Sequence, residues 1–357
     1  MLDAGYEILS GNTVVAEWVD GDLTILNAEL LPLFFGYRPD LPAWLSTRAI
    51  DPHRTNSRML KKALRLSERD DVSTSLRAHG LTITDNYWVR ECGSSLRYED
   101  VRFDEAYYRK AASRSAAKLA LSGSSKSFGV VAESRTDCVA ELTNIGSFEK
   151  CWKNIDGKWW MFKVANRGEC FSEVFICQLC AVLGISCAVY EKHGAYVRTL
   201  DFADGDYNFE PALAFMGDEE DYGKTIEKLK ELCPAAVPDY VRMIFLDALV
   251  FNPDRHTANF GLLRDKKTGA LVGLAPLFDH NMALISRGYP SEKVRKDLLI
   301  TLFADALKAY PEYREYIPAV TKDDITEALR KTAMKVNESF ITNYLLARYA
   351  AITSSIG

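Results

Sequence analysis

The chain has 357 residues, of which 48% are hydrophobic and 26% charged, and its formal net charge is −5. These values are ordinary for a globular protein and give no reason to expect a broad basic surface for direct nucleic-acid binding. No apolar run approaches the roughly 18 residues of a membrane span, and the N-terminus lacks the basic-then-apolar order of a signal peptide. We therefore expect a cytoplasmic protein without a membrane partner, built from two domains or from one large domain with an appendage.

The first hundred residues mix short strand-like runs with helical ones. Apolar and β-branched runs predict strands at 13–19 and 87–92, and an amphipathic pattern predicts a helix at 57–66. This part contains no set of residues suited to catalysis, so we expect an accessory domain that docks a partner or a substrate. The small polar stretch 122–127 predicts a loop or linker.

The middle of the chain predicts a small antiparallel sheet crossed by one helix. Three strands are expected, with turns at 145–147 and at an Asp-Gly pair, followed by a helix and by a hairpin whose turn is His193-Gly194. The expected ranges are 137–144, 149–154 and 158–165 for the strands, 169–184 for the helix and 187–202 for the hairpin.

The chain after residue 220 is predicted to be mostly helical. One hairpin interrupts the helices, with a turn in "KKTG" between the runs "NFGLLRD" and "ALVGLAPLFD". The helical patterns cover 223–233, 239–251, 291–310, 322–336 and 338–352.

The stretch "FNPDRHTANF" places several polar side chains directly after an apolar helix. Asp254 and Asn259 lie five residues apart, and the hairpin returns the chain so that Asp279 can approach them. Phosphoryl transfer needs such a set, because one carboxylate accepts the proton of the substrate hydroxyl while an amide oxygen and a second carboxylate hold magnesium. The alternative is a polar loop of turn and capping residues. His256, between the two, either takes part or orders the loop by hydrogen bonding to the backbone.

A lysine and a glutamate earlier in the chain fit the same chemistry. Lys163 lies in the strand-like run "WWMFKVA", where it either holds phosphates or extends its ammonium group to solvent. Such a lysine needs a carboxylate from a nearby helix. We favour Glu173, which shares a helix face with apolar residues, over Glu169, which follows a glycine at the start of the helix. The alternative is that both glutamates are exposed at the helix N-terminus and favoured by its dipole.

The turn in "TNIGSFEKCW" is a candidate phosphate loop. Backbone N–H groups at Gly146 and Ser147 could surround a phosphate, and the Ser147 hydroxyl and Lys150 could add contacts. A plain hairpin turn would have much the same sequence.

Together, these residues resemble the HipA-like serine/threonine kinases, best known as toxins of bacterial toxin–antitoxin pairs. The resemblance rests on five segments in the family's order: "GSFEK", "FKVA", "SEVFICQLCAVLGI", "NPDRHTANFG" and "APLFDHNMAL". It implies an α+β, two-lobed protein-kinase-like fold with an antiparallel-sheet N-lobe, a helical C-lobe and an extra N-terminal α+β domain. The expected ranges are 1–104 for the extra domain, 105–205 for the N-lobe and 206–357 for the C-lobe.

The resemblance also implies roles for the candidate residues and names the cofactors, ATP and Mg²⁺. Asp254 would be the catalytic base, Asn259 and Asp279 the magnesium ligands, and Lys163 a contact of the ATP phosphates. The adenine would lie at a hinge near Leu200 and Phe202. A protein substrate is expected, together with an antitoxin or DNA-binding regulator as partner.

The sequence departs from the best-known members at two places. Thr143 stands where those members carry a regulatory serine, so we expect slow self-phosphorylation within 143–147, with Thr143 slightly favoured over Ser147. The first hundred residues do not clearly match the family's accessory domain. Two alternative functions stay open, a kinase-fold enzyme acting on a small molecule or lipid, and a nucleotide-binding module without turnover that acts with a DNA-binding partner.

Overall fold

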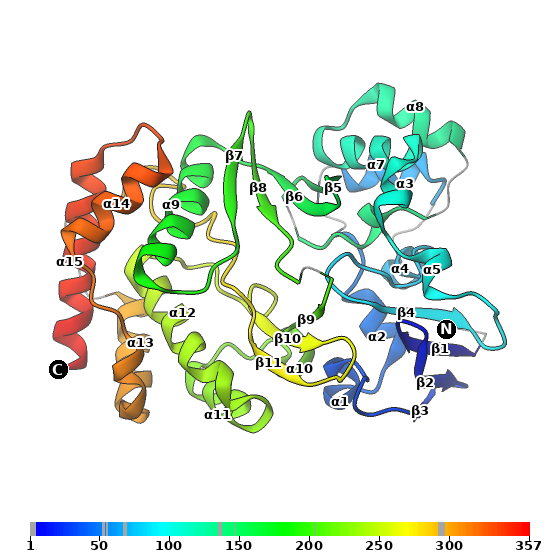
Figure 1. Ribbon diagram of the computed structural model, residues 1–357, viewed down its shortest axis with the longest axis horizontal. Helices are drawn as coiled ribbons and strands as arrows, with labels where there is room; N and C mark the ends of the chain where they lie inside the picture. Colours follow the sequence, from blue (N-terminus) through cyan, green and yellow to red (C-terminus); the bar gives the residue numbers. More distant parts are fainter. Residues whose placement is uncertain are drawn as a thin grey trace. The chain divides into compact units, whose positions relative to one another are not determined.

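The computed structural model describes residues 5–51, 54, 56–66, 70–134, 138–146, 148–203, 205–291 and 297–357. These residues form mixed α and β structure with antiparallel sheets (Figure 1). The chain divides into two compact units. Unit 1 contains 1–164, 198–210 and 264–270, and unit 2 contains 165–197, 211–263 and 271–357.

Unit 1 begins with an antiparallel sheet in the order β3-β2-β1-β4. Its strands are β1 (Tyr6–Ser10), β2 (Thr13–Val19), β3 (Asp22–Ile25) and β4 (Tyr87–Glu91), so both strands predicted in this region are confirmed. Consecutive residues are buried in these strands, such as Ile8 with Leu9 in β1 and Trp88 with Val89 in β4. Because neighbouring side chains in a strand point to opposite faces, both faces of this sheet are covered.

Short helices complete this part of unit 1, and the predicted helix at 57–66 is confirmed as α3. The helices are α1 (Leu33–Tyr37), α2 (Leu41–Ser46), α3 (Ser57–Ala63), α4 (Asp71–Arg77), α5 (Tyr98–Val101), α6 (Glu105–Arg109), α7 (Ala111–Ser122) and α8 (Ser125–Ser134).

The prediction of a loop at 122–127 is correct only for its centre, residues 123–124. Gly123 ends α7 in the left-handed conformation, with φ of 63°, and α8 begins two residues later. The Ser124 hydroxyl accepts a hydrogen bond from the Ser127 N–H at 3.3 Å, as a helix N-cap does. These small polar residues therefore lie at the junction of two helices. Their composition is equally typical of a linker, which is why a loop was predicted.

The strand predicted at 137–144 is also wrong, because Ala140–Thr143 form the 3₁₀ turn η1. The backbone here pairs with distant segments instead of a neighbouring strand, since the Leu142 carbonyl accepts from the Ile50 N–H at 2.7 Å. Leu142 lies in a core that also contains Leu9, Trp88 and Leu119, which come from the N-terminal sheet and from α7. Packing on this core explains the apolar pattern that resembled a strand.

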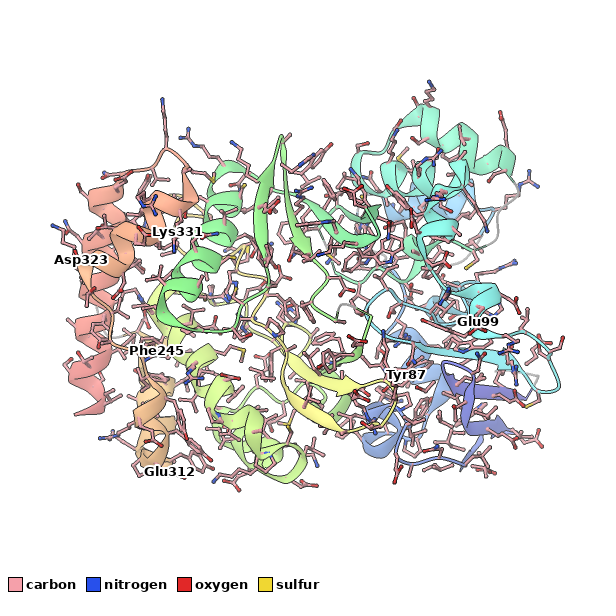
Figure 2. All side chains as sticks on the ribbon, viewed as in Figure 1. Tyr87, Glu99, Phe245, Glu312, Asp323 and Lys331 are labelled. Carbon is pink, nitrogen blue, oxygen red and sulfur yellow. The ribbon has the colours of Figure 1, made fainter. Side chains whose placement is uncertain are left out.

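Two further strands of unit 1 confirm the expected hairpin. β5 (Lys150–Ile155) pairs antiparallel with β6 (Lys158–Val164), and Asp156 and Gly157 turn the chain with φ of 53° and 80°. β8 (Tyr196–Leu200) follows β6 in the strand order, and its last three residues belong to unit 1. β9 (Tyr207–Pro211) contains Glu210, whose carboxylate accepts from the hydroxyl of Tyr87, labelled in Figure 2, at 2.7 Å.

Two buried ionisable side chains, Glu141 and Arg54, form hydrogen bonds around the segment that leads into β5. Glu141 accepts hydrogen bonds from the Trp152 N–H at 3.1 Å and from the Asn144 side chain at 3.1 Å. Arg54, also buried, donates to the carbonyls of Asn144 and Lys150. Burial raises the pKa of Glu141 to about 7, although the charge of Arg54 partly opposes the rise.

The raised pKa of Glu141 predicts that unit 1 loses stability as the pH increases. The unfolded chain ionises this carboxyl near its ordinary pKa of 4.5, whereas the folded chain does so near 7, so the stabilisation present below 4.5 disappears by pH 8. Between pH 5 and pH 8, the free energy of unfolding of Glu141→Gln, measured with urea, should fall by about 2–3 kcal/mol less than that of the wild type. The exposed substitution Glu315→Gln should leave the wild-type pH dependence unchanged. Identical pH dependence in Glu141→Gln and wild type would contradict the burial of an ionisable carboxyl here.

Unit 2 is mostly helical, as predicted. It contains α9 (Arg167–Leu183), β7 (Tyr190–His193), α10 (Leu213–Met216), α11 (Tyr222–Leu232), η2 (Pro234–Ala236), α12 (Val237–Val250), β11 (Leu271–Leu274), α13 (Leu298–Ala309), η3 (Pro311–Tyr316), α14 (Lys322–Thr332) and α15 (Glu338–Ile356). β10 (Gly261–Asp265) begins in unit 2 and ends in unit 1. Part of the helix predicted at 291–310, namely 292–296, lies outside the described residues.

The core of unit 2 forms around α12. Phe245, labelled in Figure 2, lies 5.8 Å from Phe303 of α13 and 6.4 Å from Tyr349 of α15, measured between ring centroids. Figure 1 shows α13 and α14, in orange, each beside α15, in red, and α14 also packs against α9. Within the described ranges, every helix is too short or too polar to cross a lipid bilayer. The rigid position of α12 fixes the loop that follows it.

Candidate active site

The candidate residues fall into two sets, one in each unit. Unit 2 contains Asp254, Asn259 and Asp279, which sequence reasoning assigned to base and metal-ligand chemistry. It also contains Glu173, expected to direct Lys163, and His256, expected either to take part or to order the loop. Unit 1 contains the described candidates for nucleotide contacts: Gly146, Lys150, Lys163, Leu200 and Phe202. Ser147, the remaining candidate, lies outside the described residues.

In unit 2, the loop after α12 is held by a buried ion pair. Asp247, inside α12, is fully buried and accepts from Arg255 Nε at 2.8 Å and from Arg255 Nη2 at 3.0 Å. The side chain of Asn252 donates to the same carboxylate at 2.8 Å. Phe251 ends the helix with φ of 52°, and Pro253 then prevents a helical restart. Bidentate pairing of this kind fixes both direction and distance.

Arg255 also joins the two segments that carry the candidate magnesium ligands. Its Nη1 atom donates to the carbonyl of Asn259 at 2.6 Å and to the carbonyl of Phe278 at 2.8 Å. The side-chain amide of Asn259 donates to the carbonyl of Asp254 at 3.0 Å, so its oxygen stays available as an acceptor. One buried guanidinium therefore fixes the backbone on both sides of the site.

The carboxylates of Asp254 and Asp279 interact electrostatically. Burial raises the pKa of Asp254, and the like charge of Asp279 adds to the rise, while His256 acts in the opposite direction. Asp279 has φ of 61°, in the left-handed region that aspartate tolerates better than most non-glycine residues, and its N–H donates to the Tyr190 hydroxyl at 3.0 Å. A carboxyl group whose pKa is raised by burial and by a second carboxylate is typical of a functional site.

Glu173 and Glu169 occupy different environments on α9. Glu173 is fully buried, and its Oε2 accepts from the backbone N–H of His280, next to Asp279, at 2.9 Å. Glu169 accepts from the backbone N–H of Asn166 at 2.7 Å and so forms half of a capping box. Glu173 is thus the buried acidic residue of the pair, and Glu169 has a structural partner of its own.

His256 is exposed and orders its own loop. Its Nδ1 atom accepts from the N–H of Ala258 at 3.3 Å. This is the backbone contact that the sequence analysis gave as the alternative to a direct chemical role.

In unit 1, two lysines face each other across the β5–β6 hairpin. Lys150 and Lys163 are register partners, and both are buried. Residues directly opposite in an antiparallel pair share one face of the sheet, where like charges repel. Gly146 has φ of 104°, and a Cβ atom there would collide with the ammonium group of Lys150. The ammonium group of Lys150 therefore lies beside the turn at Gly146.

The remaining residues discussed at the sequence level also lie in unit 1. Leu200 ends β8, and Phe202 packs edge-on against Phe209 with ring centroids 5.3 Å apart. Thr143 is buried, and its hydroxyl donates to the carbonyl of Leu81 and to that of Ala140. Self-phosphorylation at Thr143 would therefore require the segment to leave this position.

Sequence reasoning missed three residues that shape the site in unit 2. Asp247, Arg255 and Tyr190 hold its backbone but carry no motif of their own. Asp247 had a usable signal, because a carboxylate inside the apolar run "MIFLDALVF" must be paired when it is buried. Tyr190 had none, since its contact with Asp279 spans 89 residues.

No family model matches the chain, and no curated protein does. Among solved structures, the chain is similar to HipA of Shewanella oneidensis MR-1, solved with HipB and operator DNA, with a TM-score of 0.54 and 13% identity over 98% of this chain and 97% of that one. The kinase CtkA of Helicobacter pylori matches with a TM-score of 0.45 and 17% identity over 58% of this chain and 94% of that one. The likeness to HipA shows that the chain has a kinase-like fold, which confirms the predicted fold at that level.

Proposed function

We propose that the protein is an ATP- and Mg²⁺-dependent serine/threonine protein kinase of the HipA-like kind. The observation that carries the proposal is the arrangement in unit 2, where Arg255 holds the segments of Asn259 and Asp279 and the carboxylates of Asp254 and Asp279 interact. This arrangement occurs in a chain whose fold is kinase-like.

The donor set suits magnesium bound with a nucleotide. Among the described residues, no group of three or more His, Cys, Asp or Glu side chains could hold a metal ion by itself. Asn259 and Asp279 would supply only two oxygens, which matches a cation whose remaining ligands are phosphates and waters. When bound, Mg²⁺ neutralises charge that develops on the transferred phosphoryl group.

The side chains of the protein would then position the substrate and move a proton. Asp254, whose pKa is raised by burial and by Asp279, accepts the proton of the substrate hydroxyl. Asp279 is fixed for metal binding by the hydrogen bond from its N–H to Tyr190. Glu173 holds the backbone N–H next to Asp279 and, in the proposal, also directs Lys163. Lys163 contacts the α- and β-phosphates.

The nucleotide contacts of unit 1 complete the proposal. Lys150, Gly146 and Ser147 contact the phosphates, and the segment from Leu200 to Phe202 contacts the adenine. The position of the Lys150 ammonium group beside the turn at Gly146 supports this assignment. The proposal includes an accessory domain in 1–104, a nucleotide-binding lobe in 105–205 and a helical lobe in 206–357.

The proposed substrate is a protein, and the proposed partner is an antitoxin or a DNA-binding regulator. The HipA structure contains HipB and operator DNA, which supports a partner of this class.

Thermal unfolding with nucleotide tests the proposal. ATP at millimolar concentration should raise the melting temperature more with Mg²⁺ than without it, because a ligand of the native state stabilises by mass action. Asp279→Asn should lose most of the Mg²⁺-dependent part, since an amide is a weaker cation ligand than a carboxylate. Asp323→Asn, an exposed residue on α14, should behave as wild type. A wild-type melting temperature that ignores ATP with and without Mg²⁺ would sink the proposal.

A further inference from the structure

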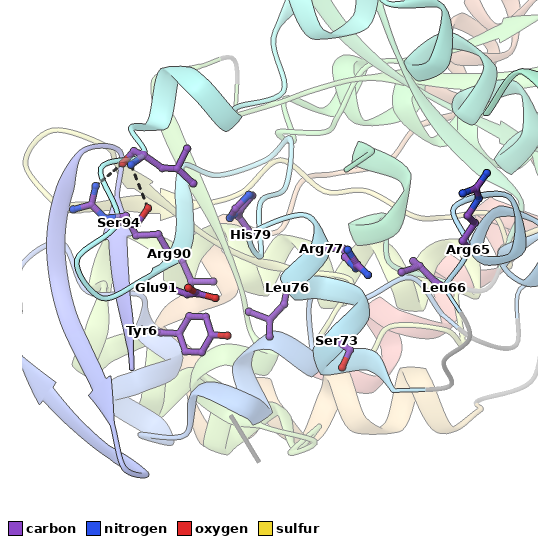
Figure 3. Close-up of a pocket in the computed structure, with 12 residues that line it drawn as sticks. Tyr6, Arg65, Leu66, Ser73, Leu76, Arg77, His79, Arg90, Glu91 and Ser94 are labelled. Carbon is purple, nitrogen blue, oxygen red and sulfur yellow. Dashed lines mark hydrogen bonds between the residues drawn. The ribbon is translucent and has the colours of Figure 1, made fainter. Parts of the chain in front are cut away.

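The N-terminal sheet of unit 1 has two edge strands, β3 and β4 (Figure 1), and they differ in what lies on their outer sides. Beside β4, the N–H of Val89 donates to the carbonyl of His79 at 2.8 Å. Figure 3 shows Leu76 and His79 next to Arg90 of β4, with which they line a pocket. Along the outer side of β3, by contrast, no described segment forms a backbone hydrogen bond. The open edge of this sheet is therefore β3.

The backbone of β3 presents unpaired groups at this edge. Leu26, the residue after β3, donates its N–H to the Val15 carbonyl at 2.9 Å and so points toward β2. Backbone groups of successive residues in a strand point to alternate sides, so the N–H and C=O groups of Leu23 and Ile25 point away from β2. They form no backbone hydrogen bond with any other described residue. These are the groups to which an added strand would bind.

The cover on the two faces of the sheet ends before β3, because apolar side chains there are exposed. Val19 is 45% exposed, Ile25 49% and Leu26 54%. Ile25 pairs with Ala16, three residues before Val19 in β2, so Val19 and Ile25 point to opposite faces of the sheet. A strand that adds to β3 with apolar side chains next to Ile25 would remove part of this surface from water.

The segment that forms this edge is acidic. Residues 1–37 contain no lysine, arginine or histidine, but they contain six acidic residues, which are Asp3, Glu7, Glu17, Asp20, Asp22 and Glu29. Arg90 neutralises Glu7, with Nε 2.5 Å from Oε2. Glu17, Asp20 and Asp22, all in the β2–β3 hairpin, form no ion pair with another described residue. The hairpin therefore carries negative charge that the described part of the chain leaves uncompensated.

This charge decides which strand can pair with β3. Glu17 pairs with Thr24 across the hairpin, so Glu17, Asp22 and Thr24 share one face. Basic residues next to Asp22 and Thr24 would lie beside the two carboxylates, and opposite charges on neighbouring strands attract. A second copy of this chain would instead bring a second acidic edge to the same junction, where like charges repel. The charge thus favours a basic partner over self-association.

We propose that the outer edge of β3 binds an extended basic segment of a partner protein, with apolar residues at alternate positions, as an added strand. The backbone of this segment pairs with Leu23 and Ile25, its apolar side chains lie beside theirs, and its basic side chains lie beside Glu17 and Asp22. The interaction does not rest on the proposed kinase activity. It gives the N-terminal part of the chain a docking function of its own.

Amide hydrogen exchange of the full chain, with and without a designed peptide, tests the proposal. The probe is a fluorescein-labelled nonapeptide of alternating lysine and valine, whose saturation is followed by fluorescence anisotropy, and its counterpart has glutamate in place of lysine. At saturation, exchange at Leu23 and Ile25 should slow at least tenfold, because their N–H groups become hydrogen-bonded. Salt should weaken the binding, and the glutamate peptide should bind at least tenfold more weakly. Absence of saturable binding, or unchanged exchange at both amides, overturns the proposal.

Variants of the edge separate backbone pairing from general charge attraction. Ile25→Pro removes an outward N–H at an edge position, where proline is tolerated, and should weaken binding at least tenfold, equivalent to about 1.4 kcal/mol. Ile25→Ala keeps this N–H and should weaken binding by about threefold or less. Glu17→Gln combined with Asp22→Asn should weaken binding about fivefold, as expected for two exposed ion pairs. The matched control, Glu312→Gln combined with Asp323→Asn, removes two exposed acidic residues of unit 2 and should leave the affinity unchanged.

A modified peptide tests strand pairing without altering the protein. A lysine–valine peptide N-methylated at its three central residues keeps its charge but cannot pair there with a strand edge, so it should bind at least tenfold more weakly. Equal binding of the methylated and parent peptides, or equal binding by the Glu17/Asp22 double variant and wild type, contradicts the proposal. So does a dimer of the free chain in sedimentation that dissociates in Ile25→Pro, because it would assign the edge to a second copy of this chain.

Discussion

Asp247→Ala should lower the free energy of unfolding by about 3–5 kcal/mol, because it leaves a buried guanidinium without its counter-charge. Asp247 is fully buried and accepts hydrogen bonds from Arg255 and from the Asn252 side chain. Removing only one partner of such a pair retains the cost of burying the other charge and loses the attraction that offset it. The loss therefore far exceeds that of a surface ion pair.

Urea unfolding of the variant and of a matched control measures this effect. Glu327 and Arg330 form an ion pair with an N–O distance of 2.7 Å on the exposed side of α14. Glu327→Ala therefore eliminates an ion pair of similar geometry that is exposed to solvent. We expect a loss of at most about 1 kcal/mol there. The double variant Asp247→Ala/Arg255→Ala completes a cycle that isolates the coupling energy of the buried pair. A loss below 1 kcal/mol for Asp247→Ala would show that the pair does not hold the loop.

The strength of this pair bears directly on the site, because Arg255 donates to the carbonyls of Asn259 and Phe278. When Asp247 is removed, the direction of Arg255 is no longer fixed, and the backbone on both sides of the candidate magnesium ligands loses its common support. A partly folded variant would therefore bind magnesium and ATP more weakly, even though Asp247 contacts neither in the proposal.

Much of the fold follows from local patterns in the sequence. The apolar and β-branched run at 13–19 predicted β2, the Asp-Gly pair after Ile155 predicted the β5–β6 turn, and the helix predicted at 169–184 corresponds to α9. These features depend on residues close in the chain, whose conformational preferences dominate. The kinase-like fold was predicted from motif order, and the similarity to HipA confirms it at that level.

The errors occurred where distant contacts decide the local structure. Residues 140–143 have the apolar pattern of a strand, but their backbone pairs with Ile50 and their side chains fill a core shared with the N-terminal sheet. Gly123 and Ser124 cap the two helices that meet here, a role that depends on where each helix ends. Neither feature could be separated from its alternative by composition or periodicity.

The chemically active residues of the candidate site could be predicted from the sequence, but the side chains that hold them in position could not. The spacing of Asp254, Asn259 and Asp279 indicated oxygen ligands and a base, and their roles stay predictions. The buried pair of Asp247 and Arg255 depends on a tertiary contact between a helix and the loop after it, and no spacing rule indicates it. Residue types that carry chemistry can be read from sequence, whereas the side chains that orient them require the structure.

Asp254→Asn should reduce phosphoryl transfer to a protein substrate by about 10²–10⁴-fold, the usual contribution of a general base. The amide keeps the shape of the side chain but cannot accept the proton of a hydroxyl. The fold should not suffer, because burial and the charge of Asp279 both raise the pKa of Asp254 and so disfavour its ionised form in the folded state. At neutral pH a neutral amide relieves this cost, and we expect a melting temperature equal to that of the wild type or slightly higher.

Transfer of labelled phosphate from ATP to lysate proteins, measured beside the thermal shift produced by ATP and Mg²⁺, separates this role from metal binding. Asp254→Asn should lose transfer and keep the Mg²⁺-dependent shift, whereas Asp279→Asn should lose both. The exposed Asp323→Asn should lose neither. If Asp254→Asn retains more than a tenth of wild-type transfer, Asp254 is not the base, and its raised pKa reflects only the neighbouring carboxylate and its burial. A variant that loses transfer while gaining stability would show directly that this carboxylate is kept at a cost to the fold because its function requires it.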